Sequence, residues 1–255
     1  MSVNYCLLSM RCKRKSEPDY CTSQCYAYLK LHGESGTGGV WGLANVPHAY
    51  AQVTVHNLPI QPSNPDAYLV IREYCRHVQA QVGDGVGLYL YAVPSAQNPK
   101  GTGTGKTTSA VAILHEYLVD RVIQHVKHER PIEQLPALFV NASKFQNQFN
   151  AQFRGPRERQ EMAAVAYYDS KEDMVAAELL VLDDVGVREA TEGFKNEFYE
   201  VIDDRCAERK ATIFTSNEPL ERLGKLLDPR IASRVEGMTI AVSFEGRDHR
   251  IEQKF

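Results

Sequence analysis

The sequence lacks a long apolar run, and it lacks a marked excess of charge of either sign. No apolar stretch among its 255 residues approaches the roughly 18 residues that a membrane-spanning helix needs, so we expect no membrane partner. Residues 1–15 contain only a short apolar patch and no small-residue cleavage site, which argues against a secretory signal peptide. Together these absences predict a cytoplasmic protein.

The formal net charge of −3 excludes a uniformly basic surface, so any contact with nucleic acid must come from a local patch. One group of basic residues surrounds Gly155 and Pro156, in a charged segment over residues 142–178 that looks helical. Its members are Lys144, Arg154, Arg157 and Arg159. They are interpreted either as an ordinary solvated face or as a patch that contacts a nucleic-acid backbone.

Cysteine is scarce, and its distribution is uneven. Two of the six cysteines, Cys75 and Cys206, lie within helical patterns and are interpreted as core residues. The other four lie near the start of the chain and are Cys6, Cys12, Cys21 and Cys25. Four thiolates suit the tetrahedral coordination of structural zinc, and in a reducing cytoplasm such clustering favours a metal over disulfides. The spacing predicts a small zinc-binding module over residues 1–33, with His32 in place of one ligand, or unligated thiols, as alternatives.

The glycine-rich stretch GTGTGKTT follows an apolar run, residues 87–93, and precedes an apolar-periodic segment that predicts a helix over residues 106–128. A strand, a glycine loop and a helix in this order are the setting of a phosphate-binding loop, whose N–H groups and helix N-terminus attract an anion. The predicted phosphate-binding residues are Gly101, Thr102, Gly103, Thr104, Gly105, Lys106, Thr107 and Thr108.

This loop lacks the first glycine of the Walker pattern. Lys100 stands five residues before Gly105, where that glycine is expected, and Gly101 comes one residue late. Lys106 is nevertheless expected to reach the β- and γ-phosphates of a nucleotide, and the Thr107 hydroxyl to bind Mg²⁺. Lys100 itself is expected to point to solvent.

Polar residues also follow two other apolar runs. Residues 179–182 are four consecutive aliphatic residues, as in a buried parallel strand, and Asp183 and Asp184 follow at the end where open α/β sheets bind ligands. Asp183 is expected to hold Mg²⁺ through water, and Asp184 to orient or deprotonate an attacking water. A further predicted strand, residues 211–217, ends in Asn217, which is placed to bond a γ-phosphate or the attacking water.

The remaining periodicities complete an α/β pattern. Helices are predicted over residues 64–82 and 191–210, and strands over residues 137–140 and 238–244. We therefore expect a parallel sheet flanked by helices. Near the end of the chain, basic residues recur that either stabilise phosphate charge, in cis or from a neighbouring subunit, or form surface ion pairs. These are Arg230, Arg234, Arg247 and Arg250.

Residues 45–255 resemble the AAA+ ATPases. The motifs LLVLDDVG, TIFTSN and RIASR follow the glycine loop in the family's order and spacing, with IDDR and VPHAY as support. More narrowly, the chain resembles bacterial and phage replicative-helicase loaders of the DnaC/DnaI type, with IstB-like transposition ATPases as relatives. The resemblance implies a P-loop AAA+ fold, ATP and Mg²⁺ as cofactors, and a slow, partner-stimulated ATPase activity.

The resemblance also implies roles for individual residues. Asn217 matches sensor 1, and Arg234, with Arg230 beside it, matches the arginine finger that acts in trans. Arg250 matches sensor 2, with Arg247 as the alternative. The implied catalytic residues are thus Asp184, Asn217, Arg234 and Arg250. A finger in trans implies self-association through ATP-binding interfaces.

The implied partners are a hexameric DnaB-like helicase and single-stranded DNA, the latter bound near residues 145–165. Residues 1–33 would contact the helicase, residues 34–60 would form a linker and a base-proximal segment, and residues 61–255 would form the ATPase domain. Trp41, in the glycine-rich part of the linker, is either a docking anchor or half-buried packing. The alternatives are an IstB-like transposition helper that assembles on duplex DNA, and an adaptor that binds ATP without hydrolysing it.

Overall fold

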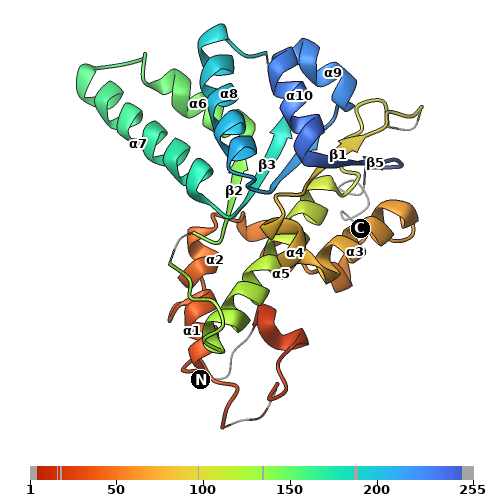
Figure 1. The fold of residues 1–255 in the computed structure, drawn as a ribbon, viewed down its shortest axis with the longest axis vertical. Helices are drawn as coiled ribbons and strands as arrows, with labels where there is room; N and C mark the ends of the chain where they lie inside the picture. Colours follow the sequence, from red (N-terminus) through yellow and green to blue (C-terminus); the bar gives the residue numbers. More distant parts are fainter. Residues whose placement is uncertain are drawn as a thin grey trace.

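A five-stranded parallel sheet forms the centre of the molecule (Figure 1). The structure is a computed structural model and describes residues 5–15, 17, 19–96, 98–133, 135–186 and 189–248. The strands are β1 (Gly87–Ala92), β2 (Ala137–Asn141), β3 (Leu179–Val185), β4 (Thr212–Ser216) and β5 (Thr239–Phe244). Their order is β2-β3-β4-β1-β5, and every neighbouring pair is parallel. The predicted α/β class with a parallel sheet flanked by helices is confirmed.

Side chains alternate along the strands between two hydrophobic clusters, one on each face of the sheet. In β3, Leu179 and Val181 belong to the first cluster, and Leu180 and Leu182 to the second. Because both faces are covered, the first four residues of β3 are all aliphatic, which is why residues 179–182 form a continuous aliphatic run in the sequence.

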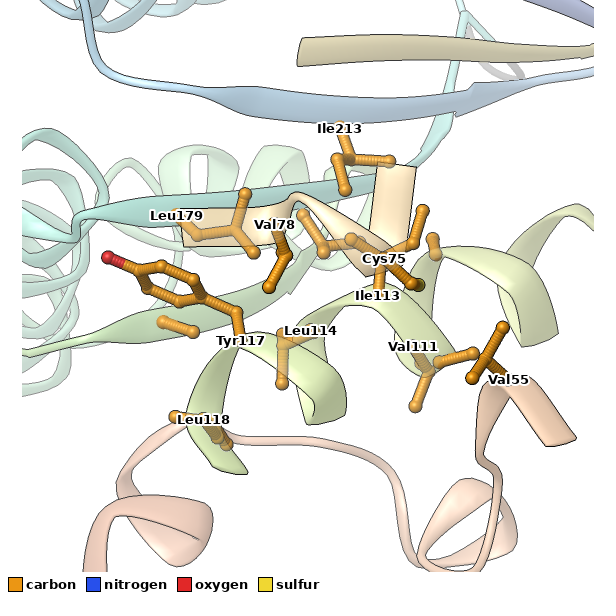
Figure 2. Close-up of a cluster of buried hydrophobic side chains, with 14 of the residues drawn as sticks. Val55, Cys75, Val78, Val111, Ile113, Leu114, Tyr117, Leu118, Leu179 and Ile213 are labelled. Atoms are coloured by element: carbon orange, nitrogen blue, oxygen red, sulfur yellow. The ribbon is translucent and has the colours of Figure 1, made fainter. Parts of the chain in front are cut away.

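The first cluster is built around α5 (Lys106–Val126), the helix that follows the glycine-rich loop. Figure 2 shows Ile113 and Tyr117 on the side of α5 that is nearer to Ile213 and Leu179 of the sheet, and Val111 beside Val55 on the other side. Helices α3 (Pro65–Arg76) and α4 (Val78–Gly83) pack on the same side. They divide the single helix predicted over residues 64–82, because His77 leaves the helical conformation.

The second face of the sheet is covered by five helices: α6 (Ala142–Ala151), α7 (Arg157–Ala176), α8 (Glu192–Ala207), α9 (Leu220–Leu226) and α10 (Pro229–Met238). The helical segment predicted over residues 142–178 is interrupted at Gly155, because its φ of +90° is incompatible with a right-handed α-helix. Pro156 then occupies the N-cap position of α7. In Figure 1, α7 extends away from the sheet.

The N-terminal segment packs on α5. Its elements are η1 (Leu7–Met10), α1 (Tyr26–His32) and α2 (Gly39–Leu43). Leu7 and Leu8 are buried in the first cluster, and Arg11 forms ion pairs with Glu116 and Asp120 of α5. Among the described residues, no helix is long and apolar enough to cross a membrane.

The glycine-rich stretch over residues 33–47 contains α2 and a buried tryptophan. Trp41 is 7% exposed, so it is a packing residue within the first cluster. Gly39 has φ of +58°, and a Cβ there would lie 2.6 Å from the backbone oxygens of Lys30 and Leu31. Only glycine fits this close approach, which joins α2 to the end of α1. Cys75 is 3% exposed and is a core residue, as predicted.

Candidate functional site

The polar residues that follow β1, β3 and β4 gather around one cavity of about 500 Å³. The carboxyl ends of parallel strands meet at one edge of a sheet, which explains this convergence. The cavity is lined from the loop and strands by residues 102–108, Asp184 and Asn217. The opposite wall comes from the segment between α2 and α3 and consists of Ala49, Tyr50, Gln52, Val53, Asn57 and Pro59. The segment predicted to lie beside a nucleotide base therefore lines the same cavity as the glycine-rich loop.

The loop curls because its three glycines adopt left-handed backbone angles. Gly101, Gly103 and Gly105 have φ of +59°, +66° and +99°. Lys106 is 6% exposed, and its Nζ donates to the Gly101 carbonyl at 2.8 Å and to Thr104 Oγ1 at 3.2 Å. An ammonium group, backbone N–H groups and the start of a 21-residue helix converge here, and this donor set fits a polyphosphate.

The turn before the loop departs from the Walker pattern as the sequence indicates. Lys100 is exposed, and Gly101 forms the corner. A Cβ at Gly101 would lie 2.4 Å from Cβ of Ala92, so the chain passes too close to β1 for any other residue.

A hydroxyl and a carboxylate suited to Mg²⁺ lie together beneath the loop. Thr107 Oγ1 donates to Asp183 Oδ1 at 2.7 Å, and Thr215 Oγ1 donates to the same oxygen at 2.8 Å. Asp183 is 5% exposed, so its carboxylate is shielded from bulk water, whereas Thr107 is half-buried and lines the cavity. Oxygen ligands of this kind fit Mg²⁺, and Thr107 and Asp183 are the residues that would hold it.

Asp184 occupies an irregular position at the end of β3. The register of β3 against β4 shifts between Leu182 and Val185, and Asp184 has φ of +59°. Its N–H donates to Thr215 Oγ1 at 2.9 Å, and Asp184 is one of the residues that line the cavity. Aspartate tolerates this left-handed conformation better than most residues, and such strain is common at functional sites.

Asn141 joins the two acids, although the sequence-based prediction does not include it. Its Nδ2 lies 3.3 Å from Asp183 Oδ2 and 3.4 Å from Asp184 Oδ2, and it pairs with Asp183 across β2 and β3. The sequence feature that could have identified Asn141 is its position directly after the strand predicted over residues 137–140, which places it at the same edge of the sheet as Asp183.

The arginines near the end of the chain lie apart from this cavity. Among the described residues, neither Arg230 nor Arg234 lines it. Arg234 forms an ion pair with Asp203 of α8. The guanidinium groups of Arg230 and Arg234 each lie 4.6 Å from the ring centre of Tyr199. The Arg234 side chain is 31% exposed. Arg250 lies outside the described residues, whereas Arg247 is on the described tail.

The basic residues predicted to contact nucleic acid lie on α6, α7 and the turn between them. Lys144, Arg154, Arg157 and Arg159 are all exposed. Arg157 pairs with Glu161 at 2.9 Å. Large apolar side chains are exposed on the same two helices and turn: Phe153, Met162, Val165 and Tyr168. Exposed cations and exposed aromatic rings therefore occur on the same two helices and the turn between them.

The predicted zinc site is not supported. No group of three or more His, Cys, Asp or Glu side chains is placed to share a metal ion in the part of the chain that the structure describes, which includes Cys6, Cys12, Cys21 and Cys25. Burial, and to a smaller extent the neighbouring cysteines, raise the pKa of Cys6 to about 11. The segment gains its order from packing on α5 instead, through Leu7 and Leu8.

A hydrogen-bond relay links the N-terminal segment to the cavity wall. Trp41 Nε1 donates to His115 Nε2 at 3.0 Å, and His115 Nδ1 lies 2.7 Å from the carbonyl of Val53. Because the tryptophan N–H can only donate, Nε2 accepts, and the neutral tautomer with hydrogen on Nδ1 satisfies both bonds. Leu7 N donates to His32 Nε2 at 3.3 Å, so His32 also accepts at this nitrogen.

We expect acid to destabilise the chain through these two histidines. Burial lowers the pKa of His32 and of His115 from 6.5 to about 4. Between these values only the unfolded state takes up the protons, so the free energy of unfolding should fall as the pH falls from about 6.5 to 4, by about 3 kcal/mol for each histidine. Urea titrations at several pH values, followed through the fluorescence of Trp41, the sole tryptophan, measure this slope.

The variant His32→Gln tests the assignment, because its amide oxygen can still accept from Leu7 N but does not titrate. Its stability should depend less steeply on pH than that of the parent chain, after correction for any difference at pH 7. An unchanged slope would contradict the assignment of His32.

The parallel sheet with a glycine-rich loop between β1 and α5 is consistent with a P-loop fold of the AAA+ type, and comparison with known proteins confirms the resemblance to DnaC- and IstB-like proteins. Residues 158–236 match the family model of IstB-like ATP binding proteins. This segment contains Asp183, Asp184, Asn217 and Arg234, and it excludes the glycine-rich loop. A search of the curated proteins found no match.

Solved structures with the same fold include replication proteins. The DnaC helicase loader is 19% identical, with a TM-score of 0.55 over 78% of this chain and 99% of that chain. DnaI is 18% identical, with a TM-score of 0.55 over 78% and 95% of the two chains. Replication initiator DnaA bound to AMPPCP and single-stranded DNA is 20% identical, with a TM-score of 0.52 over 76% and 50%. At these identities the likeness shows the fold alone.

Proposed function

We propose that this protein binds ATP and Mg²⁺ and loads a DnaB-like replicative helicase onto single-stranded DNA, hydrolysing ATP at interfaces between its own copies. The observation that carries the proposal is the convergence of Lys106, Thr107 and Asp183 with Asp184 and Asn217 around one cavity. The matches to IstB-like ATP binding proteins and to the DnaC fold support it. The proposal contains no zinc module, because the described cysteines form no metal site.

Different residues of the cavity have different roles in the hydrolysis of ATP. The glycine loop and Lys106 bind and orient the phosphates, and Thr107 with Asp183 holds Mg²⁺, which supplies charge neutralisation when bound. Asp184 orients a water molecule and accepts its proton, a role that its presence in the cavity lining supports. Asn217 lines the same wall from β4 and positions the γ-phosphate end.

Arg234 completes the site from a second copy. It is held on α10 by Asp203 and Tyr199, and it is absent from the described lining of its own cavity. A guanidinium group fixed on the surface in this way can reach the phosphates of a neighbouring subunit, where it stabilises the charge that develops in the transition state.

The helicase assignment is tested by affinity capture of a DnaB-like helicase with and without ATP. We expect capture to increase with ATP and to lose this dependence in Lys106→Ala, which removes the ammonium group from the loop. A chain that captures no replicative helicase under any nucleotide condition would contradict the loader function. Preference for duplex over single-stranded DNA would instead favour the transposition helper, which the match over residues 158–236 keeps as the second candidate.

The patch on α6 and α7 is proposed to bind single-stranded DNA. Cations that follow the phosphates and aromatic rings that stack on bases are the two features of such sites, and exposed Phe153 and Tyr168 supply the rings. We expect the double variant Arg154→Ala and Arg159→Ala to weaken binding about tenfold at low salt. The slope of log K against log salt should become shallower by about 0.7 for each phosphate that the variant no longer neutralises.

The matched control for this prediction is Arg76→Ala with Arg222→Ala. It removes the same charge from exposed arginines on α3 and α9, away from the patch. Equal losses of affinity in the two double variants would indicate a general charge effect and would contradict a local DNA site.

A further inference from the structure

The turn before the glycine-rich loop is tied to the loop by a buried asparagine. Asn98 is 6% exposed, and its side-chain oxygen accepts from Thr102 N at 3.2 Å. Its Nδ2 donates to the Thr102 carbonyl at 2.8 Å and to the Gly246 carbonyl at 3.0 Å. One side chain therefore holds both backbone polar groups of a loop residue and also the tail that follows β5.

The tail itself packs against the loop through Asp248. Thr102 Oγ1 donates to Asp248 Oδ2 at 3.0 Å. A Cβ at Gly103 would lie 1.7 Å from Asp248 Oδ1, so the carboxylate lies directly on the loop backbone where Gly103 carries no side chain. Because Gly103 has φ of +66°, glycine is needed there both for its backbone angle and for this contact.

A second buried asparagine anchors the tail without touching the loop. Asn64 is 7% exposed, and it exchanges two hydrogen bonds with the backbone of Glu245, at 2.7 and 3.0 Å. The tail is thus fixed at Glu245 by Asn64 and at Gly246 by Asn98 before Asp248 reaches the loop.

We propose that Asn98 and Asp248 are positioning residues of the nucleotide site. They hold the glycine-rich loop in its phosphate-binding shape where the first Walker glycine is missing, and they make the C-terminal tail a structural part of that loop. A loop with three left-handed glycines has many alternative conformations, and holding it in one of them before the ligand arrives lowers the entropy cost of binding. The inference rests on the proposed binding of ATP, and it specifies how this chain's loop is held.

The first test is nucleotide affinity. We expect Asn98→Ala to lower the affinity for ATP and the affinity for ADP about tenfold each. The Asn98 side chain shapes the loop that binds the phosphates, and both nucleotides carry the α- and β-phosphates. KM for ATP should rise while kcat at saturation stays within about twofold. Asp248→Ala should act in the same direction. At high salt, where charge effects are screened, Asp248→Asn should retain near-parental affinity, because its amide oxygen can still accept from Thr102.

Asn64→Ala is the matched control, because it removes two buried hydrogen bonds to the tail but no hydrogen bond to the loop. Its melting temperature should fall as in Asn98→Ala, while its nucleotide affinity should stay within about twofold of the parent. If Asn98→Ala and Asp248→Ala also bind nucleotide with parental affinity, the two residues contribute only stability, and the inference is overturned while ATP binding stands.

Hydrogen exchange of the nucleotide-free chain tests the inference independently of ATP binding. We expect the amides of residues 101–105 to exchange faster in Asn98→Ala and in Asp248→Ala, and to remain at the parental rate in Asn64→Ala. Unchanged exchange of the loop amides in all three variants would overturn the inference. Failure of the parent chain to bind any nucleotide would contradict the proposed function instead.

Discussion

Replacing Asp184 by asparagine is expected to leave ATP binding intact and to lower the rate of hydrolysis by about a hundredfold or more. This change removes the carboxylate that we propose orients and deprotonates water, and general-base groups contribute on this scale. Asparagine tolerates the left-handed backbone at this position, so the fold should be retained. ATP binding by calorimetry and phosphate release by a coupled assay measure the two effects separately.

Asp183→Asn is the comparison for this variant. It removes charge from the carboxylate that Thr107 and Thr215 contact, so it should weaken the binding of ATP with Mg²⁺ more than the binding of ATP alone. An Asp184→Asn chain that hydrolyses ATP at the parental rate would exclude Asp184 as the base. A parent chain that binds ATP without turnover would instead support the non-hydrolysing adaptor.

Replacing Arg234 by alanine is expected to lower hydrolysis by about a hundredfold or more, with little change in ATP affinity for the isolated chain. Removal of a single group that stabilises transition-state charge has an effect of this size. Arg230→Ala is the matched control, because Arg230 lies over the same Tyr199 ring, at the same 4.6 Å, and is not assigned to the neighbouring site.

Mixing two inactive variants tests whether Arg234 acts between copies. Arg234→Ala chains retain an intact cavity, and Asp184→Asn chains retain the arginine. Their mixture should regain part of the parental activity, because an interface between one chain of each kind contains both groups. A mixture that stays as inactive as its components would contradict action in trans and would assign Arg234 a structural role with Asp203 and Tyr199.

Local sequence determined the glycine-rich loop and the ends of the strands. The determinants of the loop lie within a few consecutive residues, and apolar runs that end in Asp183 or Asn217 mark strand ends that must meet at one edge of a parallel sheet. The α/β class could be predicted because apolar runs typical of buried strands and helical periodicities are both patterns of nearby residues. The break between α6 and α7 was also marked in the sequence, by Gly155 and Pro156, but the break at His77 was not.

In the N-terminal segment, the spacing of residues along the sequence is not sufficient to predict a metal site. Its cysteines suit a zinc module, yet the described thiols form no metal site, and Leu7 and Leu8 pack on α5. Arg205 is a similar case. It is fully buried and donates to the Met174, Ala177 and Ala211 carbonyls, which its place in the IDDR motif does not reveal. Whether a charged or reactive side chain is buried depends on what packs against it, and distant segments decide that.

By itself, the sequence determined that a glycine-rich loop follows the first strand of an α/β sheet, that two acids and an asparagine end two further strands, and that the loop lacks the first glycine of the Walker pattern. Only the tertiary structure decided how that loop is held. Asn98 and Gly246 are separated by 148 residues, and Trp41 and His115 by 74. Short-range patterns express backbone preferences of consecutive residues, whereas these hydrogen bonds exist only after the sheet has brought its strands together and placed the tail beside the loop.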